Sequence, residues 1–445
     1  MNRKQIIELD KKYIWHPYTE MQNYIENTHP VVAVRAEGFY IYDADGTRYM
    51  DGNGSWWTSI VGHNHPTLMQ AIVERTRQMV NCSFAGTTHE PAVQLAANLL
   101  PRCGKTFSKI FFSDDGSTAV EVAIRMAYQY WQNVGKSTKN RFVTLSGAFH
   151  GETTGCASIS GVEVFHTALA NLLFDRIVMP SPAQLADATV EDATWYVDAF
   201  GKATEILTRQ KDEIAAIIVE PLVQGAAGML MYPPEYLSEL HRLCRELDIL
   251  LICDEVFTGY GRTGAFLAQH QANIEADIVC LAKGFSGGEL PMAATITNNR
   301  VFDAFLGSAE KTLWYGHSFT GNPLGCAVAN ATLKVFDDEQ LIENLPTKMT
   351  AIDNGLKRLA KHPWVRAPRQ TGIVSAFTLM DPEGGDVASY LNQAGWKFYE
   401  EARKRGALLR PLGNVVYFAL PLTVTVKQIE ALVDVCEQSV HAAFS

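Results

Sequence analysis

Lys283 and Asp254 are the residues whose types and positions best indicate chemistry. Each follows a short apolar run, Ile278–Leu281 before the lysine and Ile249–Cys253 before the aspartate. In open α/β sheets a ligand crevice lies at the carboxyl ends of the strands, so we expect both side chains to face one crevice. An amine there can form a Schiff base with an aldehyde, and a carboxylate can keep a pyridine nitrogen protonated. These two requirements together describe a site for pyridoxal 5′-phosphate (PLP).

Each of these residues alone also has an ordinary structural explanation. An aspartate after a strand is often a helix N-cap, and a lysine past a strand is usually solvated. The surrounding string is more specific, because Asp254-Glu-Val-Phe-Thr-Gly-Tyr-Gly-Arg262-Thr-Gly precedes a Lys283 that small residues flank. This string resembles the signature of the class III, or ω-type, aminotransferases. The resemblance implies a PLP-dependent transferase of fold type I, in which Lys283 binds the cofactor and moves the proton while Asp254 holds the ring nitrogen.

A second segment has the features of a phosphate site. Gly116 and Ser117 follow the predicted strand Lys109–Ser113 and open the predicted helix Gly116–Trp131. Free N–H groups and the helix dipole at such a turn favour an anion, and glycine lets the backbone approach it closely. A simple Ser or Asp N-cap explains the turn equally well. The family resemblance implies that Gly116 and Ser117 hold the cofactor phosphate.

The resemblance also implies contacts to the cofactor ring. Gly147-Ala-Phe149-His150-Gly follows the predicted strand Arg141–Leu145. The family places an aromatic from this motif on the pyridine face, here Phe149 where relatives often have tyrosine, with His150 beside it. An ordinary core role is the alternative for Phe149. Glu220 and Gln224 are expected near the ring and its hydroxyl.

One further motif implies a shared active site. In the family, the segment that matches Gly316-His317-Ser318 belongs to the neighbouring subunit. The resemblance therefore implies that His317 and Ser318 donate to the phosphate of the neighbouring subunit's cofactor, and that Gly316 contacts substrate. A homodimer follows as the expected assembly.

The N-terminal segments indicate the substrates. Trp15-His-Pro-Tyr18-Thr and Asp51-Gly-Asn-Gly-Ser-Trp56-Trp57 resemble one branch of the family, which makes 7,8-diaminononanoate from 8-amino-7-oxononanoate in biotin biosynthesis, with S-adenosylmethionine as amino donor. The resemblance implies that Tyr18 (also catalytic), Trp56 and Trp57 contact the sulfonium and adenine. It implies that Phe149, Lys283 and Gly316 also bind substrate. Arg410 offers a clamp for the remote carboxylate of the ketone. A core role for the paired tryptophans and an internal ion pair for Arg410 are the alternatives.

Other activities stay open on this sequence. The alternatives are a class III enzyme with a lysine donor or an ω-amino acid:pyruvate specificity, a racemase or aminomutase on the same fold, and a non-catalytic PLP-fold binding protein. His63 and His65 do not predict a metal site, because no carboxylate or third histidine has matching spacing.

The elements that must position these residues alternate along the chain. The predicted strands are Lys109–Ser113, Arg141–Leu145, Ala215–Val219, Ile249–Cys253, Ile278–Leu281 and Ala293–Thr297, and the predicted helices are Gly116–Trp131, Pro234–Leu247 and Pro323–Phe336. This alternation predicts an α/β fold with a mainly parallel sheet, covered by helices on both faces and seven-stranded by resemblance.

The rest of the chain has another texture. Strands are predicted at Gly38–Tyr42, Ile373–Leu379, Ala407–Leu409 and Val415–Leu420, with helices at Ala388–Arg405 and from Thr425, where Thr425 and Gln428 form a capping-box pattern. We therefore expect a large PLP-binding domain at 65–330 and a small α+β domain at 331–445, which the segment 1–64 joins.

The composition limits the classes of binding partner and indicates a cellular compartment. The 445 residues carry a net charge of −10, which disfavours nucleic acid and anionic membranes as partners and leaves small-molecule substrates. The sequence starts without an apolar signal segment, and no run of about 18 apolar residues predicts a membrane span. The eight cysteines are scattered and never spaced Cys-x-x-Cys, so a reducing cytoplasm is the expected location.

Overall fold

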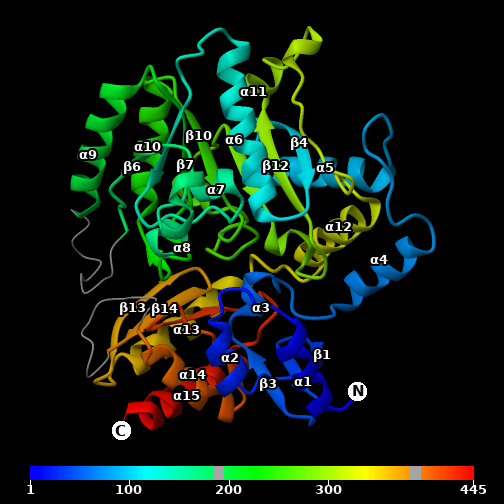
Figure 1. The fold of residues 1–445 in the computed structure, drawn as a ribbon, viewed down its shortest axis with the longest axis vertical. Coiled ribbons are helices and arrows are strands. Elements are labelled where there is room, and N and C mark those ends of the chain that lie inside the picture. Colours follow the sequence, from blue (N-terminus) through cyan, green and yellow to red (C-terminus); the bar gives the residue numbers. More distant parts are fainter. Residues whose placement is uncertain (184–194, 381–391, 445) are drawn as a thin grey trace.

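The largest sheet has seven strands and forms the centre of the upper part of the molecule (Figure 1). The computed structural model describes residues 1–183, 195–380 and 392–444. The strand order is β4-β12-β11-β10-β7-β5-β6, and β12 alone in this sheet runs antiparallel to its neighbours. The bounds are β4 Phe107–Ser113, β12 Ala293–Asn298, β11 Ile278–Leu281, β10 Leu250–Asp254, β7 Ile214–Val219, β5 Arg141–Leu145 and β6 Ile177–Met179. The predicted α/β fold with a mainly parallel sheet is confirmed.

Six of these strands were predicted, and their ends agree with the structure to within two residues. The seventh, β6, did not appear in the sequence analysis. It has three residues, too few for a run of apolar residues to stand out from its surroundings.

Helices cover both faces of the sheet because neighbouring residues of its central strands point to opposite sides. In β7 and β10, Ile218 and Ile252 pack in one cluster with α6, whereas Ile217 and Leu251 pack in a second cluster with α5, α9 and α10. The bounds are α5 Glu90–Cys103, α6 Gly116–Asn133, α9 Trp195–Gln210 and α10 Pro234–Glu246. These central strands are therefore buried on both faces, as continuous apolar runs predict.

Further helices flank this body. Helix α12 (Pro323–Asp338) packs against α4 (Pro66–Thr76) and α5. It runs through residue 330, so the predicted domain boundary there falls inside a helix. The shorter helices are α7 Thr154–Ser158, α8 Glu163–His166 and α11 Asn299–Asp303. Within the described ranges, no helix is long and apolar enough to cross a bilayer.

The two ends of the chain build the lower part of the molecule together (Figure 1). One sheet has the order β1-β2-β3-β15 and so joins N-terminal strands to a C-terminal one, and a second sheet has the order β13-β14-β16. The strand bounds are β1 Ala33–Glu37, β2 Tyr40–Asp43, β3 Arg48–Asp51, β13 Val365–Thr371, β14 Val374–Leu379, β15 Ala407–Leu408 and β16 Val415–Ala419. The helices are α1 Arg3–Tyr13, α2 Met21–Asn27, α13 Leu345–Leu359, α14 Ala394–Lys404 and α15 Val426–Phe444. A short hairpin pairs β8 (Val223–Gln224) with β9 (Leu230–Met231).

Three local predictions differ in outcome. The single strand predicted at Gly38–Tyr42 is wrong at its start, because Gly38 takes a φ of +54° and turns the chain between β1 and β2. The helix predicted at Ala388–Arg405 is α14, and its predicted residues 388–391 lie outside the described residues. The capping box is confirmed, since Thr425 Oγ1 accepts from Gln428 N–H and Gln428 Oε1 accepts from Thr425 N–H.

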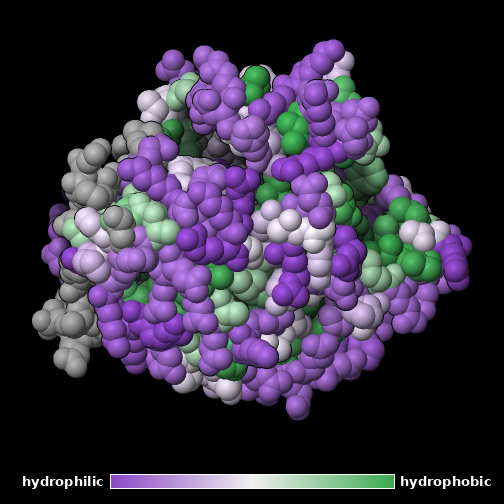
Figure 2. Space-filling view, turned by 90° about the horizontal axis from the view of Figure 1, so that it is seen from below, coloured by the Kyte–Doolittle hydropathy of each residue, from purple (hydrophilic) through white to green (hydrophobic). Residues whose placement is uncertain are grey.

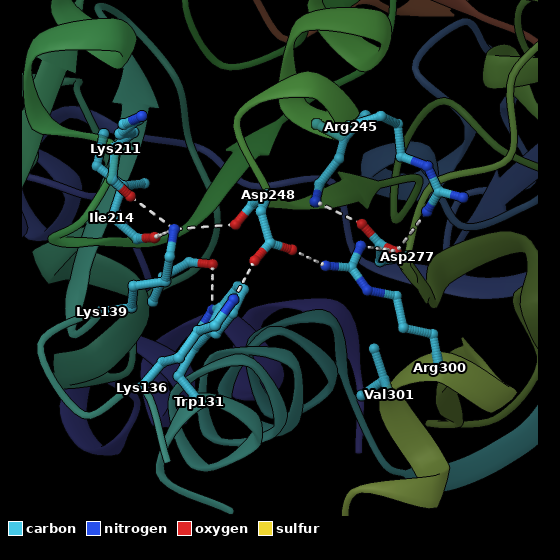
Figure 3. A network of polar contacts seen from close by, with 12 residues as sticks. Trp131, Lys136, Lys139, Lys211, Ile214, Arg245, Asp248, Asp277, Arg300 and Val301 are labelled. Carbon is cyan, nitrogen blue, oxygen red and sulfur yellow. Dashed lines mark hydrogen bonds and ion pairs between the residues drawn. The ribbon is translucent and has the colours of Figure 1, made fainter. Parts of the chain in front are cut away.

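A network of charges closes the amino-terminal edge of the large sheet (Figure 3). The buried Lys139, just before β5, donates its ammonium to the carbonyls of Lys211, Ile214 and Asp248 at 2.6, 3.4 and 2.9 Å. Its Nζ also lies 4.6 Å from the ring centroid of Trp131 at the end of α6. One ammonium therefore ties together the starts of β5, β7 and β10.

Two carboxylates continue the same network. Asp248 pairs with Lys136 and Arg300, both at 2.6 Å. Asp277, directly before β11, pairs with Arg245 and Arg300 and accepts from the backbone N–H of Leu251 in β10 (Figure 3). Each buried charge at this edge has a partner.

Candidate active site

The opposite, carboxyl-terminal edge of the sheet encloses a cavity of about 450 Å³. Its walls come from the segments that follow β4, β5, β7, β10 and β11, the position at which open α/β sheets bind ligands. Eight residues predicted from the sequence line it: Trp57, Gly116, Ser117, Phe149, His150, Glu220, Asp254 and Lys283.

Lys283 sits in the cavity wall two residues after β11. Its φ of +47° is in the left-handed region, which costs a non-glycine residue about 1–2 kcal/mol. The Nζ atom lies 5.1 Å from the ring centroid of Trp57. Desolvation by the surrounding protein lowers the pKa of this amine, and the nearby carboxylates of Asp254 and Glu220 offset part of that shift. The shift increases the fraction of unprotonated amine, which is the nucleophile and the base.

Asp254 ends β10 and is held by a histidine. Its Oδ2 lies 2.8 Å from His150 Nδ1, and its Oδ1 accepts from the backbone N–H of Val256 at 3.1 Å. The His150 ring has a second contact at its other nitrogen, with Thr144 Oγ1 at 3.5 Å. Both side chains are at most 5% exposed. This arrangement fixes a carboxylate at the cavity wall with donors on both of its oxygens.

Glu220 follows β7 and supports the segment that carries Phe149. Its two oxygens accept from the backbone N–H groups of Phe149 and Gly225, both at 2.9 Å. Burial raises the pKa of Glu220 to about 7, against the opposing effect of His150. The ring of Phe149 borders the cavity and meets Phe165 edge-on at 6.0 Å.

The amino end of α6 forms one end of the cavity. Asp115 caps the helix by accepting from Thr118 N–H at 3.0 Å. The N–H groups of Gly116 and Ser117 have no acceptor among the residues that the structure describes. Both amides and the positive end of the helix dipole are thus available to an anion.

The structure does not place Gln224 in the cavity wall. Its amide donates to the carbonyl of Ser146 at 3.0 Å and accepts from the hydroxyl of Ser181. It therefore braces the loop after β5 from behind.

The segment Gly316–Ser318 also lies outside the cavity lining of its own chain. His317 Nδ1 is 3.4 Å from Asp114 Oδ2, and its buried Nε2 has no hydrogen-bond partner within the described ranges. The carbonyl of Ser318 accepts from the side chain of Asn81 at 3.5 Å.

A strained turn carries the two tryptophans. Residues 54–57, the short helix α3 (Gly54–Trp57), all have positive φ, with φ and ψ of 45° and 56° at Ser55 and 62° and 47° at Trp56. The structure gives the two tryptophans different environments, one in the core and one at the surface. Trp57 is buried, 4.5 Å from the ring of Phe257, whereas Trp56 is 40% exposed.

Arg410 and Tyr18 both contact Trp56 and lie outside the main cavity lining. The guanidinium of Arg410 is 5.0 Å from the ring centroid of Trp56 and 5.8 Å from that of Trp396. In the described part of the chain Arg410 has no carboxylate partner, so the internal ion pair considered from the sequence is not formed. The ring of Tyr18 meets Trp56 edge-on at 5.5 Å.

The sequence analysis missed Glu152. This carboxylate lines the cavity, accepts a hydrogen bond from the hydroxyl of Tyr18, and has a pKa raised by burial. A signal was present, since Glu152 follows the Gly147–Gly151 motif at the carboxyl end of a predicted strand. Arg262 was quoted only as part of the signature. It is buried, donates to the carbonyls of Trp57 and Leu420, and has a pKa lowered to about 9 by desolvation.

The two histidines considered as metal ligands have other partners. His63 Nε2 lies 2.9 Å from Asp51, and His65 Nε2 lies 2.8 Å from Glu339. Over the described residues, no group of three or more potential ligands could hold a metal ion.

Comparison with known proteins finds relatives among the aminotransferases. The family described as Aminotransferase class-III matches residues 21–440 of the chain. A protein of Geobacter sulfurreducens named adenosylmethionine-8-amino-7-oxononanoate aminotransferase is 39% identical over 437 residues, which is 97% of this chain and 96% of that protein.

Solved structures extend the likeness to three dimensions. The crystal structure of adenosylmethionine-8-amino-7-oxononanoate aminotransferase from Methanocaldococcus jannaschii has a TM-score of 0.93 and 32% identity, with both chains fully covered. An omega transaminase from Pseudomonas jessenii, in complex with PMP, has a TM-score of 0.91 and 27% identity, with 98% of each chain covered.

Proposed function

The chain belongs to the class-III aminotransferases, and from this premise we propose that it transfers an amino group from S-adenosylmethionine to 8-amino-7-oxononanoate, giving 7,8-diaminononanoate for biotin biosynthesis. The observation that carries the reaction class is the presence of the Lys283 amine and the Asp254 carboxylate in the wall of one cavity. The names of the most similar relatives support the substrates.

The residues of the cavity fit PLP as cofactor. When bound, PLP supplies an aldehyde that captures primary amines and a ring that takes up the electrons of a broken C–H bond. The cavity offers a largely buried amine at Lys283, a fixed carboxylate at Asp254, an aromatic face at Phe149 and the free amides of Gly116 and Ser117. These match the aldehyde, the pyridine nitrogen, the ring face and the phosphate, in that order. The Pseudomonas jessenii neighbour was solved with PMP, the amine form of this cofactor.

Lys283 has two tasks in this proposal. Its Nζ would hold the cofactor when PLP is bound, and the same amine would accept the proton from the donor carbon. Both tasks need the neutral amine, which desolvation favours. The nearby Asp254 and Glu220 would limit the shift, so that Nζ can also return the proton to the acceptor carbon.

Asp254 and Glu220 are both acidic residues near the Lys283 amine. The contacts to His150 and to the backbone N–H of Val256 fix the Asp254 carboxyl group, which would hold the pyridine nitrogen when the cofactor is bound. His150 acts through Asp254 as a positioning residue. Glu220, whose pKa of about 7 lets it gain or lose a proton near neutrality, lies beside this pair and is proposed to contact the ring hydroxyl. Gln224 is proposed to act only by supporting the loop after β5.

The outer part of the site suits the two substrates. The Arg410 guanidinium has no internal carboxylate partner among the described residues and is available for the terminal carboxylate of 8-amino-7-oxononanoate. Tyr18, Trp56 and Glu152 offer aromatic faces and a negative charge for the sulfonium and adenine of S-adenosylmethionine. Gly316 is proposed to complete this surface from the neighbouring subunit.

We include a homodimer with shared active sites in the proposal. Two features of this segment support the proposal: within the described ranges His317 Nε2 is buried without a hydrogen-bond partner, and Trp314 is 77% exposed. In Figure 2 a hydrophobic patch lies at the right edge, where Figure 1 places α4. The exposed apolar side chains of α4 and the segment after it include Val73, Met79 and Val80. His317 and Ser318 would then reach the neighbour's phosphate.

A reducing cytoplasm is kept as the proposed location, since Cys253 and Cys280 serve as small apolar residues inside buried strands.

The test is turnover by the purified protein loaded with PLP. We expect 7,8-diaminononanoate to form from 8-amino-7-oxononanoate with S-adenosylmethionine, and ping-pong kinetics because both substrates use one site. Lysine, ω-amino acids and a reaction without donor are the comparison arms. If product forms only with lysine, lysine is the amino donor and the proposed donor is wrong. If the protein aminates pyruvate but not 8-amino-7-oxononanoate, both proposed substrates are wrong.

The second candidate is an ω-transaminase of other specificity. The close structural agreement with the Pseudomonas jessenii omega transaminase favours it, since the fold and cavity position serve either activity. The Arg410 guanidinium, which has no carboxylate partner among the described residues, favours a substrate with a carboxylate. The donor and acceptor comparisons above separate the two candidate functions.

A further inference from the structure

Residues 54–57 form one left-handed turn at the entrance of the site. Gly54, Ser55, Trp56 and Trp57 have φ values of 55°, 45°, 62° and 76°. Glycine takes this conformation easily, but three successive L side chains do so only when the surrounding structure holds them. The turn therefore stores strain and must be held in place.

The turn sends its two indoles in different directions. Trp57 packs on Phe257, with 4.5 Å between the ring centroids. The Lys283 Nζ atom lies 5.1 Å from the Trp57 ring centroid. Trp56 lies against the Arg410 guanidinium at 5.0 Å. Two neighbouring residues thus contact both the reacting amine and the cation proposed for the remote carboxylate. A right-handed or extended backbone at Ser55 and Trp56 would turn at least one indole away.

A buried carboxylate holds the middle of this turn. Asp51 is 3% exposed, and its Oδ2 accepts from the Ser55 hydroxyl at 2.8 Å and from His63 Nε2 at 2.9 Å. His63 is itself fixed, because its backbone exchanges two hydrogen bonds of 2.9 Å with Gly38. The charge that holds Ser55 is therefore anchored on two sides.

Other contacts bind the backbone of the turn. Thr58 Oγ1 donates to the carbonyl of Ser55 at 3.1 Å, and the N–H of Ser59 donates to the carbonyl of Gly54 at 3.0 Å. Arg262 donates to the carbonyl of Trp57 at 2.9 Å, and the Asn53 side chain donates to the carbonyl of Tyr417 at 3.1 Å. Asp51 supplies a side-chain hydrogen bond to a residue within the left-handed run. Thr58 and Arg262 bind backbone carbonyls of the run, whereas Asp51 binds the side chain of Ser55.

We propose that Asp51, supported by His63, is a positioning residue for substrate specificity. It keeps Ser55 left-handed, and through this turn it holds Trp56 against Arg410 so that the guanidinium meets the tail carboxylate of the ketone. The inference rests on the proposed function for the identity of that ketone. It concerns backbone handedness, so it can be tested at a residue that touches no substrate.

Ser55 gives the matched pair of variants. Ser55→Gly and Ser55→Val both remove the hydroxyl at an exposed position, but glycine tolerates the left-handed backbone and valine does not. We expect Ser55→Val to raise KM for 8-amino-7-oxononanoate roughly tenfold and Ser55→Gly to raise it about twofold. Equal changes in the two variants would overturn the proposal, because the hydroxyl alone would then matter.

Asp51 itself is tested by rescue. Asp51→Asn should raise the same KM roughly tenfold, and adding Ser55→Gly should recover most of the loss, since glycine needs less support. The control is Asp43→Asn, a buried carboxylate in the same sheet that accepts from Tyr49 and the backbone but not from the turn. It should lower stability without raising KM. A KM increase in Asp51→Asn that Ser55→Gly leaves unchanged would contradict the proposal, and if Asp51→Asn does not fold, the Ser55 pair decides alone.

A binding measurement separates this inference from the proposed function. Nonanoate shares only the carboxylate and the chain with the ketone, and its dissociation constant can be measured by NMR titration without turnover. It should weaken in Ser55→Val far more than in Ser55→Gly. If the wild type binds nonanoate and shows this pattern but does not aminate 8-amino-7-oxononanoate, the proposed function fails and the role of Asp51 stands. Equal binding in both variants overturns that role.

Discussion

Lys139 and Lys283 lie at opposite edges of the same seven-stranded sheet, and burial lowers the pKa of both amines. At the amino-terminal edge, Lys139 donates to three carbonyls and faces an indole (Figure 3). At the carboxyl-terminal edge, Lys283 has no hydrogen-bond acceptor in the described ranges and borders the cavity that Asp254 shares. A lowered pKa is thus common to both, and the free amine facing a cavity is what distinguishes the candidate catalytic lysine.

The carboxylates repeat the contrast. Asp277 at the amino-terminal edge is held by Arg245, Arg300 and the backbone N–H of Leu251 in β10. Asp254 at the other edge has a histidine and one amide, and it lines open space. One edge uses buried charge to join strands, and the other keeps it available to a ligand. This difference can be tested one residue at a time.

The largest expected effect is that of Lys283→Ala. Loss of both the nucleophile and the base should lower kcat by at least about a thousandfold. The apo protein should keep its thermal midpoint, because the amine holds no part of the fold together. Turnover assays and thermal unfolding of the apo form measure both. Near-normal turnover would rule out the proposed mechanism.

Lys139→Met is the matched variant at the other edge. It leaves three carbonyls without their donor, so we expect a loss of stability of about 2 kcal/mol or more and a kcat within about threefold of wild type. Urea unfolding and steady-state kinetics check this. If Lys139→Met abolishes turnover in a protein that remains folded, the assignment of a purely structural role to Lys139 is wrong.

Asp254→Asn should have the next largest effect. An amide cannot hold the pyridine nitrogen protonated, so we expect kcat to fall roughly a hundredfold or more while Lys283 still binds the cofactor covalently. Borohydride reduction followed by mass spectrometry detects that bond. Asp277→Asn is the control and should reduce stability by about 2 kcal/mol with little change in kcat. Wild-type kcat in both half-reactions of Asp254→Asn would remove its assigned role.

Arg410→Ala tests the outer end of the site. If this guanidinium binds the tail carboxylate, KM for 8-amino-7-oxononanoate should rise roughly ten- to a hundredfold, because a charge-assisted hydrogen bond is lost. The half-reaction with S-adenosylmethionine should suffer less, since it depends on Tyr18, Trp56 and Glu152. Single-turnover kinetics of each half-reaction measure the two effects. Equal losses would indicate a general structural role for Arg410.

The smallest expected effect is a pH dependence of stability from Glu220. Its folded-state pKa of about 7 exceeds the ordinary value of about 4.3, so between these values the folded protein binds a proton that the unfolded chain has released. The free energy of unfolding should therefore fall as pH rises through this interval. Glu220→Gln in the apo protein should make that fall shallower between about pH 5 and pH 8. Denaturant titrations across this range give the slopes, and identical slopes would show that Glu220 does not titrate there.

The sequence predicted the site best where chemistry and strand ends coincide. Asp254 and Lys283 follow long apolar runs, and the edge at which strands end is the same for all parallel strands, so local pattern alone placed both residues together. The same reasoning missed Glu152, because the loop after β5 must fold back before that carboxylate can reach the cavity and Tyr18.

Gln224 and Arg410 show the limit of reasoning from motifs. The sequence analysis assigns both residues to the site, but packing directs the Gln224 amide to Ser146 and Ser181. Packing likewise sets Arg410 between two indoles that come from distant parts of the chain. Which way a side chain points depends on neighbours that local sequence does not reveal.

The sequence by itself determined the family, the mainly parallel sheet and the pairing of an amine with a carboxylate at one edge of it. These follow from apolar periodicity and from residue types at strand ends, which are local properties. Only the tertiary structure decided that Lys139 has three acceptors while Lys283 has none among the described residues, and that Trp56 is exposed while Trp57 is buried. It also decided that Ser55 is left-handed under the control of Asp51. Each of these depends on partners far away in the chain, whose positions are set by packing of the whole molecule.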